Sequence, residues 1–271
     1  MTSDAASDPT SPGSTADGPG ARLCRVTTFQ LGGPCRNLRT CAEPGDLLLA
    51  LRDLAPSGDS PVILGGGSNL LISDEGLDSV VIRYRSDQLT IRRTGDEVET
   101  DGSAPLAALA EWAVEEGLSG LEFATGIPGT VGGGIAGNAG AFGRQLADIL
   151  KTLQVADTAG QLREADPSEF QFSYRDSTLK VRGLIVVTAR FRLKPGDRGA
   201  LRAERDRIRS SDAIGIRTGG SRRRRAVSSG ISSPVLRRSD VRPPAGFSTR
   251  SARAPFRWAA PGFLKNTRTS S

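Results

Sequence analysis

The first 200 residues consist of short apolar runs that alternate with polar turns. Three successive runs have the composition of β-strands, in which β-branched and aromatic residues alternate with polar ones. They read SVVIRY (79–84), QLTIRR (88–93) and EVETDG (97–102). Thr94, Gly95 and Asp96 separate the last two runs and are turn-forming residues. A turn between two strands is therefore expected at 94–96.

One segment has a helical period instead. PLAALAEWAVEEG (105–117) carries leucine, alanine and valine at helical spacing, with Pro105 at its start and Gly117 at its end. Further on, KTLQVADTAGQLREA (151–165) predicts a hairpin, and GLIVVTARFRL (183–193) predicts a strand that is half buried in its second part. Because strands outnumber helices, the pattern predicts a mixed α+β fold.

Two glycine-rich segments interrupt this pattern, PVILGGGSNLLISD (61–74) and GIPGTVGGGIAGNAGAFG (126–143). An uncharged glycine loop after a strand can direct several backbone N–H groups at phosphate oxygens. Standard fingerprints do not fit, because Leu70 stands where a dinucleotide-binding turn has its third glycine and no Lys-Ser/Thr pair follows the second segment. Flexible loops are the alternative, although Val131 and Ile135 argue against a solvated linker in the second segment.

Missing residue types limit the chemistry. The sequence has no histidine, which excludes Ser-His-Asp and Cys-His nucleophile pairs and imidazole metal ligands. Cys24, Cys35 and Cys41 lack C-x-x-C spacing, so reduced thiols and no metal site are expected. No apolar run approaches the roughly 18 residues of a membrane span. Residues 1–20 contain no apolar segment and are typical of a disordered tail rather than a signal peptide, so a cytoplasmic protein without a membrane partner is expected.

The net charge of +6 is the sum of two unlike parts. Residues 201–271 hold 17 of the 36 Lys and Arg residues but 4 of the 30 acidic residues, so this segment carries +13 and residues 1–200 carry −7. The first 200 residues are acidic and the remainder is basic, which makes the overall charge a poor guide to partners.

Four motifs in a fixed order decide among these interpretations. They are TTFQLGGPC (27–35), GGGSNLL (65–71), GLEFATGIPGTVGGGIAGNAGAFG (120–143) and FSYRDSTLK (172–180). Together they resemble the UDP-N-acetylenolpyruvoylglucosamine reductase family over residues 22–195. The resemblance implies an α+β FAD-binding fold of the vanillyl-alcohol oxidase and p-cresol methylhydroxylase type, with two α+β subdomains followed by a third, substrate-binding domain.

The same resemblance gives the glycines a role. It implies that residues 65–70 and 126–141 are two walls between which the pyrophosphate and isoalloxazine of FAD lie, so that the glycines leave room for a large cofactor. Asn138 could bind the cofactor, or it could simply occupy a turn position with left-handed backbone, which Asn tolerates. The residues expected to bind the cofactor are Gly65, Gly66, Gly67, Ser68, Asn69, Leu70, Gly126, Pro128, Gly129, Thr130, Gly132, Gly133, Asn138, Gly140 and Ala141.

The family reaction implies two hydride transfers, from NADPH to the flavin and from the flavin to the enolpyruvyl double bond of a UDP-sugar. Arg175 matches the arginine of the family that meets the developing negative charge, and a guanidinium suits a planar carboxylate. The alternative is a surface arginine paired with Asp176 or another nearby acid. Tyr174 is expected to contact substrate, by packing in the site rather than through its hydroxyl.

The motifs of the third domain have no match. Neither the proton-donating serine of a G-S-x-F-x-N-P segment nor a late glutamate can be assigned, since Ser221 runs into four arginines and no Glu follows Glu204. The expected organisation is a disordered tail (1–21), an FAD-binding domain (22–195), a helical connector (196–216) and a basic remnant (217–271).

Residues 217–271 allow three interpretations: a basic polyanion-binding arm, a divergent substrate domain, or the product of a reading-frame change in a GC-rich gene. The third is favoured, because 12 of the 13 basic residues are Arg. Two further functions compete with the reductase, namely a flavin oxidase or dehydrogenase of the same fold acting on another small substrate, and a non-enzymatic polyanion-binding protein. A monomer that binds a UDP-sugar and no nucleic acid is expected.

Overall fold

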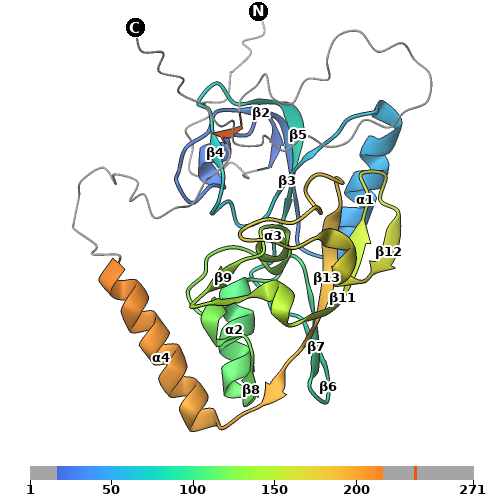
Figure 1. Cartoon of the computed structure of the whole chain (residues 1–271). Helices are drawn as coiled ribbons and strands as arrows, with labels where there is room; N and C mark the ends of the chain where they lie inside the picture. Colours follow the sequence, from blue (N-terminus) through green and yellow to red (C-terminus); the bar gives the residue numbers. More distant parts are fainter. Residues whose placement is uncertain (1–16, 216–234, 237–271) are drawn as a thin grey trace, which may run out of the picture.

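The computed structural model describes residues 17–215 and 235–236, which form two sheets with a short helix between them (Figure 1). The first sheet has the order β1-β2-β5-β3, and the central strand β5 is parallel to both of its neighbours. Its strands are β1 (Gly18–Pro19), β2 (Cys35–Cys41), β3 (Val62–Leu64) and β5 (Leu77–Tyr84). The strand β5 is buried along most of its length, as its run of apolar residues requires.

The second sheet is entirely antiparallel and has the order β12-β11-β13-β7-β6. Its strands are β6 (Ile91–Thr94), β7 (Glu97–Asp101), β11 (Leu150–Ala156), β12 (Leu162–Ala165) and β13 (Ile185–Arg192). The helices α2 (Leu106–Glu115) and α3 (Val131–Ala136) share the main hydrophobic core with this sheet. The apolar face of α2, with Leu106, Leu109 and Ala113 fully buried, explains why it forms a helix here.

A third cluster of apolar residues joins the two sheets. It includes Leu47 and Leu51 of α1 (Pro44–Leu54), Ile82 of β5 and Val187 of β13. The phenol of Tyr84 donates a hydrogen bond of 2.9 Å to the backbone oxygen of Val187, and burial raises the pKa of Tyr84. Apolar side chains therefore hold the two sheets together, and the helix α3 lies close to that junction (Figure 1).

Short elements complete the described part of the chain. Three two-stranded pairs are β9 (Gly140–Ala141) with β10 (Arg144–Gln145), β8 (Leu118–Ser119) with β14 (Lys194–Pro195), and β4 (Leu71–Ile72) with β15 (Val235–Leu236). Five 3₁₀ helices are η1 (Leu23–Arg25), η2 (Ala55–Ser57), η3 (Glu122–Ala124), η4 (Leu146–Asp148) and η5 (Pro167–Phe170).

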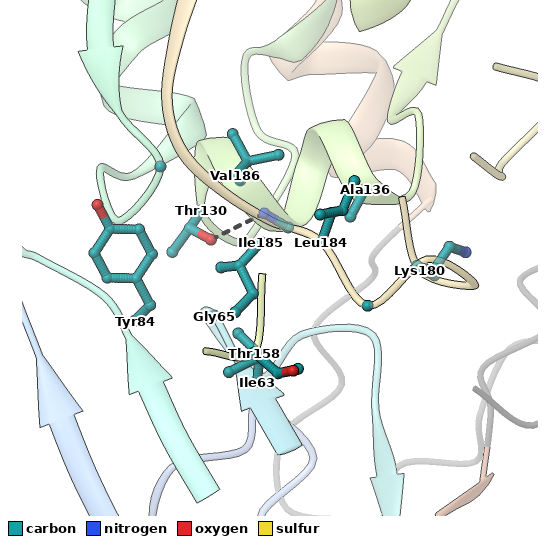
Figure 2. Close-up of a pocket in the computed structure, with 14 residues that line it drawn as sticks. Ile63, Gly65, Tyr84, Thr130, Ala136, Thr158, Lys180, Leu184, Ile185 and Val186 are labelled. Carbon is teal, nitrogen blue, oxygen red and sulfur yellow. Dashed lines mark hydrogen bonds between the residues drawn. The ribbon is translucent and has the colours of Figure 1, made fainter. Parts of the chain in front are cut away.

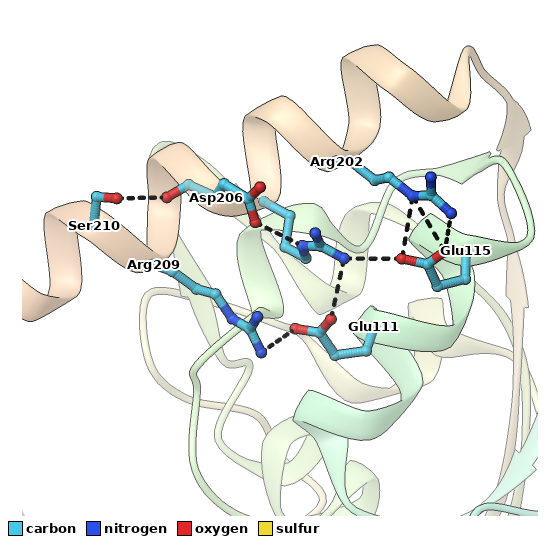
Figure 3. Close-up of polar contacts among 7 residues, drawn as sticks. Glu111, Glu115, Arg202, Asp206, Arg209 and Ser210 are labelled. Atoms are coloured by element: carbon cyan, nitrogen blue, oxygen red, sulfur yellow. Dashed lines mark hydrogen bonds and ion pairs between the residues drawn. The ribbon is translucent and has the colours of Figure 1, made fainter.

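The long helix α4 (Arg198–Gly215) lies along α2 and is held there by ion pairs (Figure 3). Arg202 and Arg205 bind Glu115, and Arg209 binds Glu111 at 2.8 Å. This helix falls within the connector expected at 196–216. No helix in the described ranges is long and apolar enough to cross a membrane.

Most of the expected elements are present. The runs at 79–84, 88–93 and 97–102 correspond to β5, β6 and β7, and Gly95 turns between the last two with a φ of 63°. The hairpin expected at 151–165 is the pair of β11 and β12. The strand β2 and the helix α1 were not expected from the sequence. The expectations for residues 1–16, 216–234 and 237–271 lie outside the described residues.

Candidate functional site

The two glycine segments meet in the structure. The loop 65–70 follows β3, and the segment 126–130 leads into α3. The hydroxyl of Ser68 donates a hydrogen bond of 3.1 Å to the backbone oxygen of Pro128. A Cβ atom on Gly66 would lie 2.8 Å from the Cα of Gly129, closer than real Cβ atoms approach other atoms. Glycine at 66 is therefore required for contact between the two segments. This role was not expected from the sequence.

Backbone N–H groups of the first loop are available to a ligand. Within the described ranges, the N–H groups of Gly66, Gly67 and Ser68 donate no hydrogen bond. Gly67 has a φ of 67°, and a Cβ there would lie 2.3 Å from the oxygen of Val26. Consecutive unpaired N–H groups in such a turn form a concave anion site. The loop therefore fits a phosphate group of the cofactor implied by the family.

The backbone N–H groups in the first turn of α3 already donate hydrogen bonds to other protein groups. The N–H groups of Val131 and Gly132 bind the oxygens of Ala104 and Gly102 at 2.9 and 2.8 Å, and the N–H of Gly133 binds the hydroxyl of Thr130 at 3.3 Å. Its first-turn donors are thus occupied by protein groups. The loop at 66–68 differs from the first turn of α3 in that its donors are free for an anion.

A narrow cavity separates the end of the first sheet from α3 (Figure 2). Its volume of about 80 Å³ suits part of a large ligand rather than all of it. The predicted cofactor residues on its wall are Gly65, Thr130, Gly132 and Gly133. Sequence reasoning missed the other lining residues, which include Ile63, Tyr84, Thr158, Lys180, Ile185 and Val186. Lys180 belongs to the FSYRDSTLK motif, so its position in that motif could have indicated that it lines the site.

A second pocket of about 460 Å³ opens beyond α3, within the size range of ligand sites. It is formed by the β9–β10 hairpin and by the turn at 173–176. Five predicted site residues line it together, Asn138, Gly140, Ala141, Tyr174 and Arg175, with Phe142, Gly143, Arg144 and Gln145. Nine of the predicted site residues thus line one of the two hollows. Those that line neither are Gly66, Gly67, Ser68, Asn69, Leu70, Gly126, Pro128 and Gly129.

Strained backbone is concentrated at this second pocket. Five non-glycine residues of the described chain have positive φ, and three of them line the pocket: Asn138 (41°), Phe142 (55°) and Arg175 (59°). Such conformations cost about 1–3 kcal/mol each and cluster at functional sites. The concentration here favours a functional role for the pocket.

Asn138 holds the pocket in shape. Its side-chain nitrogen donates to the side-chain oxygen of Gln145 and to the backbone oxygen of Ser173, both at 2.8 Å. Its side-chain oxygen accepts from the N–H of Ala147 at 3.2 Å. Because both amide hydrogens are used and the residue is buried, Asn138 is a positioning residue, and its left-handed backbone agrees with the turn alternative.

Arg175 has no carboxylate partner among the described residues. Asp176, the partner that the alternative interpretation named, binds Lys180 at 2.6 Å instead. The guanidinium carbon of Arg175 lies 5.9 Å from the ring centroid of Tyr174. Tyr174 is 84% exposed and lines the pocket, and its packing against a substrate stays a prediction. The pocket thus carries a cation that is free to meet an anion.

The cysteines are remote from this chemistry. Cys35 and Cys41 are buried and Cys24 is partly exposed, and all three are free thiols. Burial raises the pKa of Cys35, and it raises that of Cys41 to about 11. Within the described part of the chain, no cluster of three or more Cys, Asp or Glu residues is arranged to hold a metal ion.

Comparisons with known proteins agree with this geometry. The family model "FAD binding domain" matches residues 37–166. UDP-N-acetylenolpyruvoylglucosamine reductase of Caulobacter sp. strain K31 is 42% identical over 205 residues, covering 73% of this chain and 66% of its own length. The protein of the same name from Caulobacter vibrioides is 37% identical over 73% of this chain and 68% of its own length. The chain therefore spans about two thirds of the length of these relatives.

A solved structure shares the fold. The crystal structure of UDP-N-acetylenolpyruvylglucosamine reductase from Thermus caldophilus superimposes with a TM-score of 0.62 at 32% identity, over 72% of this chain and 68% of that one. The predicted α+β FAD-binding fold and the prediction of FAD as cofactor are confirmed by these matches.

Proposed function

The chain belongs to the UDP-N-acetylenolpyruvoylglucosamine reductase family, and on that premise we propose that it is an FAD-dependent oxidoreductase of peptidoglycan precursor synthesis. The reaction of the site takes UDP-N-acetylglucosamine enolpyruvate as substrate and NADPH as reductant. The 271-residue chain is expected to carry out the transfer from NADPH to the flavin without completing the step to UDP-N-acetylmuramate. It works as a cytoplasmic monomer. The observation that carries the proposal is Arg175, a cation without a carboxylate partner in the described chain, on strained backbone in a ligand-sized pocket.

The residues present fit FAD. The free N–H groups of Gly66, Gly67 and Ser68 would hold its pyrophosphate, which requires donors and no nearby carboxylate. The narrow cavity beside α3, with Gly65 and Gly132 on its wall, would take a flat part of the molecule. When bound, FAD supplies the hydride chemistry, accepting a hydride from NADPH and passing it to the carbon–carbon double bond.

Arg175 has the electrostatic task. Hydride addition to an enolpyruvyl group builds negative charge on the enolate and its carboxylate. The guanidinium can donate two parallel hydrogen bonds to a carboxylate, and such bonds are about twice as strong as neutral ones. The tight turn, in which Ser173 and Asp176 exchange two backbone hydrogen bonds of 3.0 and 3.3 Å, fixes the backbone of Arg175 before the substrate binds. A preorganised cation of this kind stabilises the transition state.

The flavin is the first test. The purified chain should be yellow, should release FAD on denaturation and should lose its flavin absorbance under NADPH without oxygen. A colourless, folded protein that takes up no added FAD would overturn the proposal. Flavin that is reduced by a small alcohol or amine and not by NADPH would favour the oxidase alternative.

A further inference from the structure

A second arginine faces the same pocket as Arg175. Arg144 lies on β10, directly after the loop that forms the pocket wall, and its side chain is 46% exposed. Its guanidinium lies 5.7 Å from the ring centroid of Phe123. One of its nitrogens, Nη1, donates to Oε2 of Glu122 at 3.0 Å. The side chain is thus held on two sides while part of it remains open to solvent.

Glu122 is the anchor that fixes Arg144. Its side chain is 3% exposed, and both carboxylate oxygens accept from the N–H of Gly120, at 3.1 and 3.0 Å. A buried carboxylate is costly unless it is paired and hydrogen-bonded. Removing either partner would leave a buried charge or an unpaired arginine, so the two residues stabilise each other in one arrangement.

The remaining donors of Arg144 have no protein partner. A guanidinium carries five N–H donors, and among the described residues Arg144 makes the single bond to Glu122. The nearby Glu204 forms an ion pair with Arg207, at 2.7 and 2.6 Å, and none with Arg144 among the described residues. Arg144 therefore offers free donors to whatever enters the pocket.

The pocket lining contains two arginines and no carboxylate. Two cations at separate points of one hollow fit a ligand with two separate anionic groups. A nucleotide-linked acid has this form, with a carboxylate at one end and a diphosphate further along. A guanidinium binds phosphate oxygens as well as it binds carboxylates.

We propose that Arg144, held by Glu122, is the phosphate-binding position of this pocket, and that Arg175 takes the carboxylate when the ligand is the UDP-sugar. The inference rests on the proposed function and names a specificity-determining residue for it. The chemistry that Arg144 recognises is a nucleotide diphosphate, which either the UDP-sugar or the dinucleotide reductant can supply.

Calorimetric titration of the FAD-supplemented protein with UDP, inorganic pyrophosphate and NADP⁺ tests the proposal. Arg144→Gln should weaken UDP and pyrophosphate binding about 10- to 100-fold, because a charge-assisted hydrogen bond is lost. Arg175→Gln should leave pyrophosphate binding unchanged and weaken binding of the enolpyruvyl substrate. Arg92→Gln, an exposed arginine of β6 outside the pocket lining, is the matched control and should change nothing.

Two further variants separate binding from stability. Arg144→Gln leaves Glu122 buried without its cation, so Glu122→Gln/Arg144→Gln removes both charges together. The double variant should regain thermal stability but not affinity. Arg144→Lys should recover part of the affinity, because the charge remains while the fork is lost.

The outcomes are distinct. A loss with UDP alone assigns Arg144 to the sugar nucleotide, a loss with NADP⁺ alone assigns it to the reductant, and a loss with both shows that the position is shared. Unchanged affinity for all three ligands in Arg144→Gln would overturn the inference and leave the proposed function standing, provided that NADPH still reduces the flavin. A flavin that is not reduced would overturn the proposed function, and the pyrophosphate titration would still decide the role of Arg144.

Discussion

At the scale of single residues, Gly66 and Gly129 show that the lack of a side chain can be required for two loops to pack. The Cα of Gly129 occupies the space that a Cβ on Gly66 would need, at 2.8 Å. The obstacle is backbone and not the end of a flexible side chain, so it cannot move aside cheaply. The contact also keeps the free N–H groups of residues 66–68 beside the second glycine segment.

Gly66→Ala is therefore expected to push the two segments apart. Overpacking of this kind costs about 1–3 kcal/mol, so the midpoint of thermal unfolding should fall and FAD should bind more weakly. Gly45→Ala is the matched control, because Gly45 lies in α1, has ordinary φ and has no atom within 4 Å of the added Cβ. Thermal unfolding followed by circular dichroism, with a flavin titration, measures both effects. Equal behaviour of the two variants would contradict the assigned role of Gly66.

At the scale of elements, α4 is attached to the body both by ion pairs and by apolar contact through the buried Leu201 and Ile208. Glu115 of α2 accepts from Arg202 and Arg205 (Figure 3). The hydrogen bond from Arg202 holds the pKa of Glu115 below its ordinary value of 4.5. A carboxylate with a lowered pKa stabilises the folded arrangement above the ordinary pKa, and this contribution is lost as the pH falls through the lowered value.

Protonation of Glu115 should therefore loosen α4. Hydrogen exchange of the amides of residues 198–210, corrected for the intrinsic rate at each pH, should show less protection near pH 3 than near pH 7. Glu115→Gln should reduce protection at pH 7 and weaken its dependence on pH. Glu204→Gln is the control, because Glu204 pairs with Arg207 within α4 and does not connect the two helices. Equal protection in both variants at both pH values would show that apolar packing alone holds α4.

At the scale of the whole molecule, residues could be assigned to the cofactor site more completely than to the substrate site. The two glycine segments, Arg175 and Arg144 all lie within the described residues. The serine that protonates the product and the late glutamate of the family have no assigned counterpart in the sequence. The cofactor half of the proposed reaction is therefore better supported than the product-forming half.

The chain is accordingly expected to oxidise NADPH slowly, with electrons passing to oxygen, and to form no UDP-N-acetylmuramate. Mass spectrometry of a reaction containing FAD, NADPH and UDP-N-acetylglucosamine enolpyruvate measures the product directly. Clear product formation would show that a serine and an acid left unassigned carry out the second half. Translation of the 3′ half of the gene in all three frames should show a G-S-x-F-x-N-P segment in another frame, and its absence would refute the reading-frame interpretation.

The sequence by itself determined the family, the order of the motifs and the elements with a clear period. The strands β5, β7 and β13 and the helix α2 follow from local alternation, because the side chains that face the core recur every two or every 3.6 residues along one element. The prediction of FAD followed from four motifs in a fixed order along the sequence. It did not require knowledge of how these motifs contact one another in the fold.

Tertiary structure alone decided what each polar side chain does. The pairing of Arg144 with Glu122 spans 22 residues, and Asn138 reaches Ser173 across 35, so no local pattern could reveal either contact. Whether Arg175 is paired or free depended on the ion pair between Lys180 and Asp176. The close approach of Gly66 to Gly129 depended on how the loop after β3 meets the loop before α3. The period of apolar residues is a property of a single helix or strand and can be read from the sequence. The partner of a charged side chain depends on how several elements pack together, so only the fold specifies that partner.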